Sequence, residues 1–187
     1  MLVDIFSSPK PEEDYVDYVS RLCADGAEQI GEGDSASVFF NPREAWVVLK
    51  IATTGEGNAL AWTKWCYENS TLYTPRVFFV EELPFQASWR VAYYRAFIEM
   101  LTPATETDVV NFISHHKLGE VIVRINEPSQ PSEWAIHQKH IPTIIEPDLR
   151  KVVEKIHELT HLNFADLSVR NFMMRGAQLV FVDPVPY

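Results

Sequence analysis

The sequence has 187 residues, a length typical of one domain, which can be built as two small lobes. Hydrophobic residues make up 47% of it, enough for a packed core, so the composition argues against a disordered chain. The formal net charge of -10 argues against electrostatic binding to nucleic acid or to anionic lipid, because both need clustered cations. We therefore expect neither a nucleic-acid partner nor a membrane partner.

Signals for export or for membrane insertion are not evident. No stretch reaches the roughly 18 consecutive apolar residues of a membrane span. The N-terminal residues lack the basic region and long apolar run of a secretory signal. Cys23 and Cys66 lie far apart in the sequence, so we expect buried free thiols rather than a disulfide or a zinc site. These features indicate a soluble, cytoplasmic protein.

The first hundred residues predict a helix, an antiparallel sheet and a second helix. Pro11 opens the first helix, which ends near residues 25–26. Residues 58–70 alternate apolar and polar positions at the helical period and predict the second helix. Five extended runs are separated by turn signals and lie at 29–30, 37–40, 45–51, 77–80 and 91–101. A five-stranded antiparallel sheet with one main helix is the simplest interpretation.

After Pro103 the pattern becomes mostly helical. Residues 105–118 predict a helix, and 119–147 are irregular apart from a short strand at 121–125. An amphipathic helix is predicted at 148–161, with its apolar side formed by Leu149, Val152, Val153, Ile156 and Leu159. A loop then leads to Asn171, followed by a hairpin of residues 172–174 and 179–182.

The first candidate site is a glycine-rich turn, GEGDSASV, at residues 31–38. Gly31 and Gly33 carry no side-chain bulk, so main-chain N–H groups there can approach phosphate oxygens beneath the turn. An ordinary hairpin turn has the same pattern. The turn is not a Walker A loop, because no Gly-Lys-Ser/Thr follows. It also differs from a dinucleotide fingerprint, because it leads into a strand and not into a helix.

The second candidate is Lys50, in the apolar run VVLKI one strand beyond the glycine turn. A lysine among such neighbours can point inward and reach the α- and β-phosphates of a nucleotide. The alternative is an ordinary strand lysine that faces solvent.

The third candidate carries the most information. Asp166 and Asn171 lie five residues apart on one predicted loop, and Asp183 follows an apolar strand. A carboxylate can accept or orient the proton of a hydroxyl group, while carboxamide and carboxylate oxygens suit Mg²⁺. An aspartate at the end of a strand is by itself usually a turn former. The three residues together are typical of phosphoryl transfer.

In this order, the glycine turn, the strand lysine, the helix after it and the D-x4-N…D pattern resemble the protein-kinase-like superfamily. The segment DLSVRNFMMRGAQLVFVDPV, at 166–185, is most similar to an atypical branch with D-P-V in place of D-F-G. That branch includes the early serine/threonine kinases of podovirus coliphages. Minimal kinases that bacteria deliver as type III effectors are similar in style. The resemblance covers residues 29–101 and about 148–187.

The resemblance implies an α+β fold of the two-lobe, protein-kinase-like kind. Residues 1–101 would form an N-lobe with a leading helix, a five-stranded antiparallel sheet and one main helix. Residues 102–187 would form a strongly reduced helical C-lobe. Because the sequence ends four residues after Asp183, no activation segment and no large helical lobe are expected.

ATP and Mg²⁺, or Mn²⁺ in its place, are the cofactors that the resemblance implies. Asp166 would be the catalytic aspartate, and Asn171 and Asp183 would bind the metal. Lys50 would act in catalysis and in phosphate binding, with Glu68, or alternatively Glu56, as its acidic partner. The remaining contacts to ATP would come from Gly31, Gly33, Ser35, Val38 and the main chain of Glu99 and Leu101.

The sequence also departs from the family pattern. Phe164 and Ala165 stand where His-Arg commonly precedes the catalytic aspartate, and Ser168 stands where protein kinases often carry lysine. Arg170 would either place charge near the transferred phosphoryl group or be a surface arginine. His115 and His116 are expected to be solvated histidines at a helix end rather than metal ligands.

The implied activity is ATP- and Mg²⁺-dependent phosphorylation of serine or threonine in a protein of a host cell. The chain would act there as a phage protein or as a bacterial effector. One alternative is a pseudokinase that binds and blocks a host protein. Others are a small-molecule phosphotransferase of the aminoglycoside kind, which usually needs a larger helical lobe, and nucleotidyl transfer from ATP.

Overall fold

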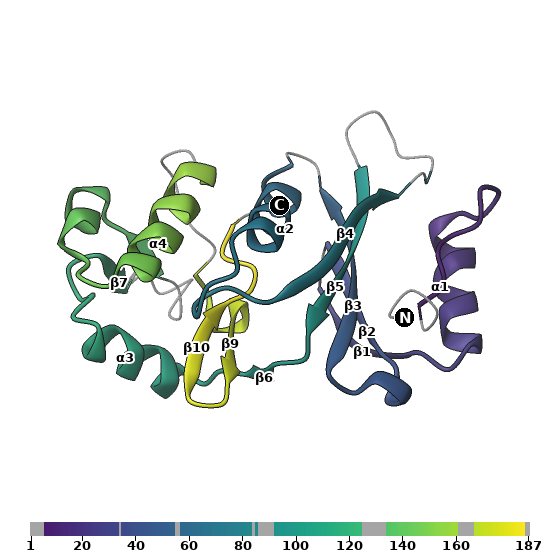
Figure 1. The fold of residues 1–187 in the computed structure, drawn as a ribbon, viewed down its shortest axis with the longest axis horizontal. Helices are drawn as coiled ribbons and strands as arrows, with labels where there is room; N and C mark the ends of the chain where they lie inside the picture. The colour runs from purple at the N-terminus through teal and green to yellow at the C-terminus, as the bar shows by residue number, and fades with distance from the viewer. Residues whose placement is uncertain are drawn as a thin grey trace. The chain divides into compact units, whose positions relative to one another are not determined.

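The structure is a computed structural model, shown in Figure 1. Its fold is α+β, with a five-stranded antiparallel sheet and a few helices. The structure describes residues 6–33, 35–54, 57–83, 85, 92–124, 134–160 and 167–185. They divide into two units. The first unit contains the residues up to Tyr67 and Arg76–Met100, and the second contains Glu68–Pro75 and the residues from Leu101 onward.

The first unit is built on the predicted five-stranded antiparallel sheet, which is confirmed. Its strand order is β1-β2-β3-β5-β4, so β3 is central. Residues 47–52 of β3 are all buried, which explains why its sequence is apolar almost without interruption. The five strands are β1 (Glu28–Glu32), β2 (Ala36–Phe40), β3 (Val47–Thr54), β4 (Val77–Leu83) and β5 (Ala92–Glu99).

Helices α1 (Tyr15–Ala24) and α2 (Asn58–Glu68) cover opposite faces of this sheet (Figure 1). Side chains alternate between the two faces along a strand, so neighbouring residues of β3 face different helices. On the α1 face a core cluster includes Phe6, Tyr18, Leu22, Phe39, Leu49, Ile51 and Phe97. On the α2 face the Thr63 Oγ1 atom lies 3.3 Å from the Tyr94 hydroxyl group.

Helix α1 begins at Tyr15 and not at Pro11, so the predicted start was wrong. Residues 10–13 form a turn, in which the Glu13 amide donates to the Lys10 carbonyl group at 3.0 Å. Asp14 then caps the helix by accepting from the Asp17 amide at 2.9 Å. The Asp14 carboxylate accepts from a main-chain N–H group of the first turn, which has no partner within the helix. A proline side chain has no acceptor atom, so the Asp14 cap determines where the helix starts.

The cysteines differ from each other. Cys66 is buried and does not form a disulfide with Cys23, as predicted, but Cys23 is exposed, so the prediction that Cys23 is buried was wrong. Helix α1 buries Tyr18 and Leu22, and Cys23 lies one position outside this apolar stripe.

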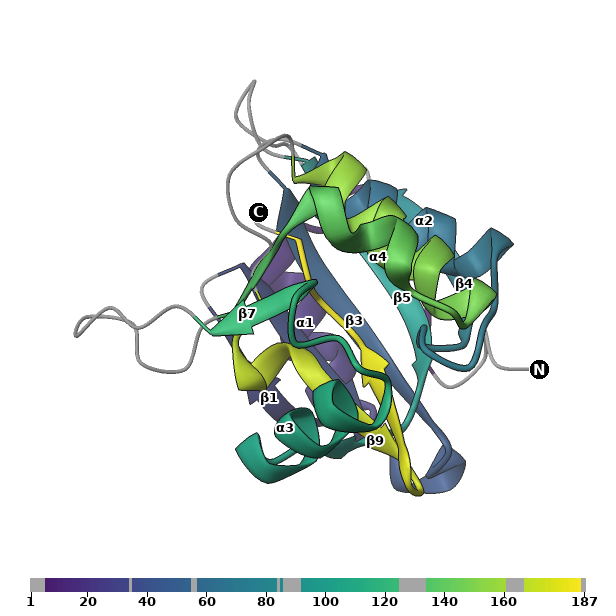
Figure 2. The ribbon, with the colours of Figure 1, turned by 90° about the vertical axis from the view of Figure 1, so that its left-hand side faces the viewer.

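The second unit contains two helices, a hairpin and short strands (Figures 1 and 2). Helix α4 (Pro147–Leu159) confirms the predicted amphipathic helix, and all five of its predicted apolar residues are buried. Helix α3 (Glu106–His115) and the hairpin of β9 (Phe172–Arg175) and β10 (Gln178–Phe181) are also confirmed. Helix α3 packs against the hairpin, where the ring centroids of Phe112 and Phe181 lie 6.0 Å apart.

The short strand predicted at 121–125 is confirmed as β7 (Ile122–Arg124), which forms an antiparallel pair with β8 (Trp134–Ile136). Strand β8 and the other short elements of this unit were not predicted. Strand β6 (Thr102–Pro103) pairs with β9 and makes the hairpin a three-stranded sheet. A 3₁₀ turn at Gln138–Thr143 follows in the stretch that was predicted to be irregular, and another lies at Val169–Asn171.

The segment Glu68–Pro75 follows α2 in sequence but belongs to the second unit. The Tyr73 carbonyl group accepts from the Phe181 amide at 2.9 Å. The Arg175 guanidinium donates to the carbonyl groups of Leu72 and Thr74 at 3.1 and 2.8 Å. These bonds fasten the segment to the hairpin.

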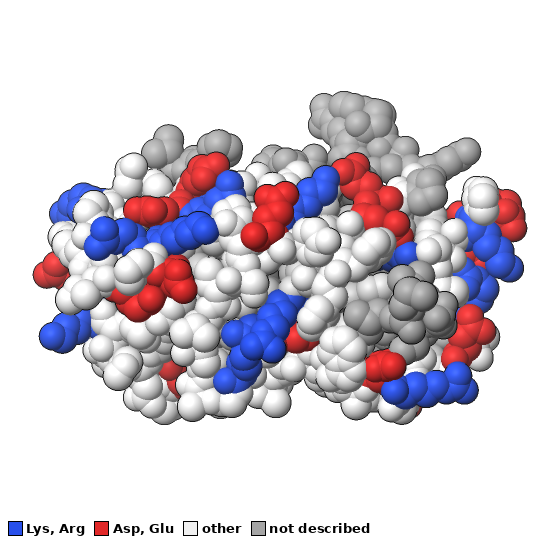
Figure 3. Space-filling model, viewed as in Figure 1, with Lys and Arg blue, Asp and Glu red and all other residues white. Residues whose placement is uncertain are grey.

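Two observations bear on the expected partners. Across the described residues, no helix is long and apolar enough to cross a bilayer. On the face drawn in Figure 3, lysine and arginine lie among aspartate and glutamate instead of forming one basic patch.

Candidate functional site

A single row of residues crosses the sheet of the first unit and contains three of the predicted site residues. Gly31 of β1 lies opposite Val38 of β2, and Val38 lies opposite Lys50 of β3. Lys50 in turn lies opposite Ala96 of β5. Directly opposed residues of antiparallel strands project from the same face, so this row belongs to one face of the sheet.

Lys50 is buried, with only 5% of its surface exposed. The solvent-facing alternative for this lysine is therefore wrong. It lies between Leu49 and Ile51, which belong to the core cluster on the α1 face, so Lys50 projects to the α2 face. Burial of an ammonium group is costly unless polar groups meet it, so a lysine at this position needs a reason.

The glycine turn is closed by a hydrogen bond from the Gly33 amide to the Ala36 carbonyl group at 2.8 Å. Neither Gly31 nor Gly33 has a positive φ. A Cβ atom would meet Val38 at 3.5 Å if added to Gly31, and the Ala36 carbonyl oxygen at 3.9 Å if added to Gly33. These are ordinary contacts, so the chain itself does not require glycine at either position.

Of the other residues named for this part of the site, the structure describes Ser35 and Glu68. Ser35 is half-buried, and Asp34 lies outside the described residues. Glu68 is the last residue of α2 and is exposed, whereas Glu56 lies outside the described residues. The pairing of Lys50 with either glutamate stays a prediction.

The end of β5 is fixed by main-chain and side-chain bonds. The Glu99 amide donates to the Arg76 carbonyl group at 3.0 Å, and the Glu99 carboxylate accepts from the Arg76 amide at 2.7 Å. The Met100 amide donates to the Trp46 carbonyl group at 2.8 Å. Glu99 therefore has a structural role in the first unit, and the chain enters the second unit at Leu101.

In the second unit the structure brings the two predicted metal ligands to one end of the β9–β10 hairpin. The Asn171 carbonyl group accepts from the Val182 amide at 3.0 Å, which continues the ladder one step beyond the Phe172–Phe181 pair. Asp183 follows Val182 directly. Twelve positions separate Asn171 and Asp183 in sequence, but the hairpin places them at the same open end.

The loop before the hairpin is described from Leu167, which is buried. Asp166, the predicted catalytic aspartate, lies outside the described residues, as do Phe164 and Ala165. The Ser168 carbonyl group accepts from the Asn171 amide at 2.9 Å. The Ser168 Oγ atom is buried, and no hydrogen-bond partner for it is found among the described residues.

The donor set at this hairpin end fits Mg²⁺ in kind. Asn171 and Asp183 offer carboxamide and carboxylate oxygens, which Mg²⁺ prefers. No group of three or more His, Cys, Asp or Glu that could hold a metal occurs in the part of the chain that the structure describes. Two such ligands would bind Mg²⁺ together with phosphate oxygens, as is common where the ion binds with a nucleotide.

The two helix-end histidines differ from each other. His115 is exposed as predicted, but His116 is half-buried, so the prediction of two solvated histidines was wrong for His116. Its ring centroid lies 4.6 Å from that of Phe112 and 5.6 Å from that of Tyr73. Burial, and then the neighbouring charge of His115, lower the pKa of His116. Arg170 is exposed, in line with the surface alternative for this residue.

The sequence did not single out a cleft of about 570 Å³ in the second unit. It lies between α3 and the turn of the hairpin. Its signal in the sequence was the pair of histidines at the end of α3. The lining residues include Asp108, Asn111, His115, His116, Met174 and Gln178.

No protein-family model matches the chain, and no curated protein matches its sequence. The support for a function therefore comes from the residues of the chain and from their geometry.

Proposed function

We propose that the chain is an ATP- and Mg²⁺-dependent protein serine/threonine kinase with a reduced two-lobe, protein-kinase-like fold. The observation that carries the proposal is the burial of Lys50 in one row with Gly31 and Val38. A lysine on a central strand beside a glycine turn is the arrangement that holds nucleotide phosphates in kinases.

The glycines give independent support. Among the described residues, no backbone strain and no close contact requires glycine at position 31 or 33, so their lack of side chains calls for another reason. Phosphate groups that approach the main-chain amides of the turn would supply that reason.

In the proposed reaction, the γ-phosphoryl group of ATP passes to the hydroxyl oxygen of a serine or threonine. The bond from the γ-phosphorus to its bridging oxygen breaks, a bond to the hydroxyl oxygen forms, and ADP leaves. The hydroxyl proton passes to the Asp166 carboxylate, which also orients the acceptor. Lys50 neutralises charge on the phosphates that are not transferred.

Asn171 and Asp183 are proposed to hold Mg²⁺. The ion would neutralise phosphate charge when it is bound. The hairpin contributes by fixing both ligands at one end, through the bond between Asn171 and Val182. The proposal makes a protein of a host cell the acceptor.

The test is transfer of label from ATP to proteins of a host lysate, followed by mass spectrometry of the modified sites. The chain is expected to transfer label from γ-labelled and not from α-labelled ATP. Asp183→Asn should reduce the rate by about 10²- to 10³-fold. The control Asp148→Asn alters an exposed aspartate of α4 and should keep the rate.

Other outcomes would identify the alternatives. Binding of ATP without transfer to any acceptor would indicate a pseudokinase. Label on small molecules but not on proteins would indicate a small-molecule phosphotransferase, and transfer of the α-label would indicate a nucleotidyl transferase. A rate of Asp183→Asn equal to that of the unmodified chain would overturn the assigned role of Asp183.

A further inference from the structure

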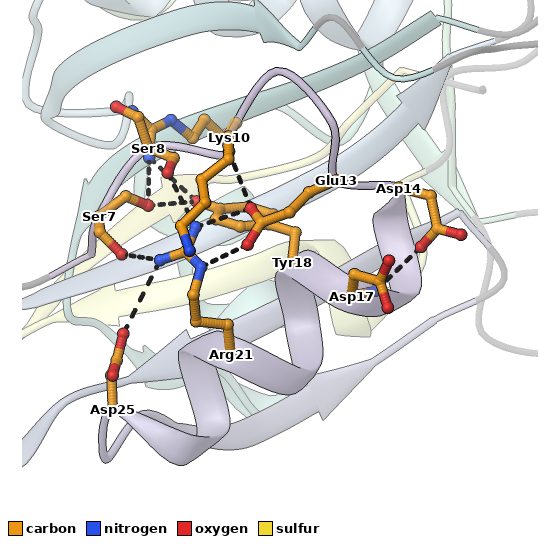
Figure 4. Close-up of polar contacts among 10 residues, drawn as sticks. Ser7, Ser8, Lys10, Glu13, Asp14, Asp17, Tyr18, Arg21 and Asp25 are labelled. Atoms are coloured by element: carbon orange, nitrogen blue, oxygen red, sulfur yellow. Dashed lines mark hydrogen bonds and ion pairs between the residues drawn. The ribbon is translucent and has the colours of Figure 1, made fainter.

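Two arginines from different elements contact the segment that precedes α1. Figure 4 shows Arg21 beside Ser7, Ser8 and Glu13. Arg95 comes from β5 and is buried, with 1% of its surface exposed, and Arg21 comes from the last turn of α1. Both contact Ser7 and Ser8.

Arg95 uses each of its nitrogen atoms. The Nε atom donates to the Glu81 carboxylate, and Nη1 donates to the Tyr18 hydroxyl group at 3.0 Å. The Nη2 atom donates to the Ser8 Oγ atom at 2.7 Å. The guanidinium also lies 5.6 Å from the ring centroids of Phe79 and Phe97. Its position is therefore fixed by packing and by hydrogen bonds.

Arg21 holds the same segment from the other side. Its Nη2 atom donates to the Ser8 carbonyl group at 2.8 Å, and its Nη1 atom donates to the Ser7 Oγ atom. It also forms a bidentate pair with the Glu13 carboxylate, at 2.6 and 2.8 Å. This hydrogen bonding lowers the pKa of Glu13 to about 2.

Ser8 differs from Ser7 in its access to solvent. Ser8 is exposed, whereas Ser7 is half-buried. The Ser8 hydroxyl group is thus accessible to another molecule and already hydrogen-bonded to a fixed guanidinium. A phosphoryl group on this oxygen would bring three acceptor oxygens and about two negative charges next to Arg95 and Arg21.

We propose that Ser8 is a phosphorylation site, modified by a second copy of this chain, and that Arg21 and Arg95 hold the phosphate. This inference rests on the proposed kinase function for its phosphoryl donor. The bond from the γ-phosphorus of ATP to its bridging oxygen breaks, a bond to Ser8 Oγ forms, ADP leaves, and the hydroxyl proton passes to the base of the second copy.

The need for a second copy follows from the sheet. Arg95 lies opposite Ile51, a member of the core cluster on the α1 face, so Arg95 and Ser8 belong to that face. Lys50 projects to the other face of the same sheet. Ser8 of one molecule therefore does not meet Lys50 of that molecule while the segment keeps its place.

The charges around Ser8 determine the expected effect. Glu81 and Glu13 already balance Arg95 and Arg21, so the phosphate competes with these carboxylates. Charge-assisted bonds from arginine to phosphate can be bidentate and are stronger than the present bond to a neutral hydroxyl group. We expect the phosphate to tighten the attachment of the segment to the sheet.

The first experiment introduces phosphoserine at position 8 during synthesis, so that it needs no kinase activity. We expect the Tm to rise by about 2–4 °C, which corresponds to a gain near 1 kcal/mol in the free energy of unfolding for a chain of this size. We also expect ³¹P NMR titration to show a second phosphate pKa below its ordinary value near 6, because the guanidinium groups favour the dianion. Phosphoserine in place of the exposed Ser70 is the matched control and should show neither change.

An unchanged Tm together with an ordinary phosphate pKa would overturn the role of the two arginines. Arg21→Gln serves as a second variant, because it leaves the buried Arg95 in place. The shift of the phosphate pKa should shrink in this variant, and an undiminished shift would exclude Arg21 from the site.

The second experiment incubates the chain with ATP and Mg²⁺ and maps its phosphorylated residues by mass spectrometry. Phosphate is expected on Ser8, at a rate per molecule that rises with protein concentration. Ser8→Ala should lose this phosphate and keep transfer to lysate proteins, and Ser7→Ala should keep both. Transfer to lysate proteins without phosphate on Ser8 would overturn the inference alone. Absence of any transfer would instead overturn the proposed function, and with it the donor assigned to Ser8.

Discussion

Lys50 lies directly opposite Val38 in the β2–β3 pair. Val38 has a second partner, Gly31, in the β1–β2 pair. An apolar side chain therefore separates the glycine turn from the lysine within a single row of the sheet. In the proposed site, a nucleotide would pack on Val38, between the glycine turn and Lys50.

Replacement of Lys50 by methionine should weaken ATP binding by about 10- to 100-fold, equivalent to about 1.4–2.7 kcal/mol. The variant should stay folded, because methionine is apolar and keeps much of the volume of the lysine in this buried position. Isothermal titration with ATP and denaturant unfolding measure the two effects.

The matched control for this change is Lys64→Met. Lys64 is an exposed lysine of α2 that pairs with Glu82 at 2.8 Å. Its loss should leave ATP binding unchanged and should alter stability by no more than about 1 kcal/mol. Equal ATP affinities of Lys50→Met and Lys64→Met would remove the main support for a phosphate site at Lys50.

Gly33→Ala should separate the needs of a ligand from those of the fold. Among the described residues, the added Cβ atom meets only the Ala36 carbonyl oxygen, at 3.9 Å, so stability should change by no more than about 0.5 kcal/mol. Affinity for ATP should fall, because the methyl group occupies the space next to the turn. Gly26→Ala is the comparison variant, in which the fold itself requires glycine, because Gly26 has a positive φ of 94°.

At Gly26 an alanine is strained, and about 1–2 kcal/mol of stability should be lost with ATP affinity unchanged. Thermal unfolding and titration of both variants with ATP give the comparison. If Gly33→Ala loses stability and keeps its affinity, the glycine turn is a structural hairpin and not a nucleotide cover.

Ser168→Ala should keep or raise the free energy of unfolding, by up to about 1 kcal/mol. The Ser168 Oγ atom is buried without a hydrogen-bond partner among the described residues. A buried hydroxyl group that makes no hydrogen bond lowers the free energy of unfolding. Denaturant unfolding measures this free energy, and Ser114→Ala, which changes an exposed serine of α3, is the control. A clear loss of stability in Ser168→Ala alone would reveal a partner for this hydroxyl group.

Glu13→Gln should lower the Tm at neutral pH, because the bidentate pair with Arg21 loses its charge. The pKa of Glu13 is about 2 in the folded chain, against 4.5 for the unperturbed group. A group with a lowered folded pKa stabilises the folded state above the unfolded pKa and loses this contribution as pH falls through the folded one. The difference in Tm should thus be complete above about pH 4.5 and should shrink toward pH 2.

Thermal melts of the unmodified chain and of Glu13→Gln between pH 2 and pH 7 measure this difference. Glu12→Gln changes the exposed neighbour and should show no such pH dependence. A constant difference between Glu13→Gln and the unmodified chain at every pH would show that the pair contributes nothing through its charge.

The elements with a clear hydrophobic period could be predicted from the sequence. Helix α4 repeats its apolar residues at helical spacing, and the β9–β10 hairpin has apolar runs on both sides of Gly176, which needs its positive φ of 62°. Strand β6 has two residues, too few for any period, and it exists because β9 pairs with it. The start of α1 was misplaced at Pro11, because the aspartate cap at Asp14 determines where this helix begins.

Some features of the candidate site could be predicted from the sequence, and others could not. The hairpin that joins Asn171 to Val182 follows from the sequence, since its two strands and its turn were recognisable. The burial of Lys50 does not, because strand lysines usually face solvent and only the packing of α2 on that face decides it. Arg95 was missed, although its alternation with Tyr93 and Phe97 along β5 placed it on an apolar face.

The bonds from Arg175 to Leu72 and Thr74 have a consequence for any attempt to split the protein. The chain changes units after Tyr67, after Pro75 and after Met100, so the two units are interleaved along the sequence. A fragment that ends at Met100 would carry the eight residues of Glu68–Pro75 away from the hairpin that holds them. Neither half can be expressed by truncation at one point without exposing main-chain groups that the other half satisfies.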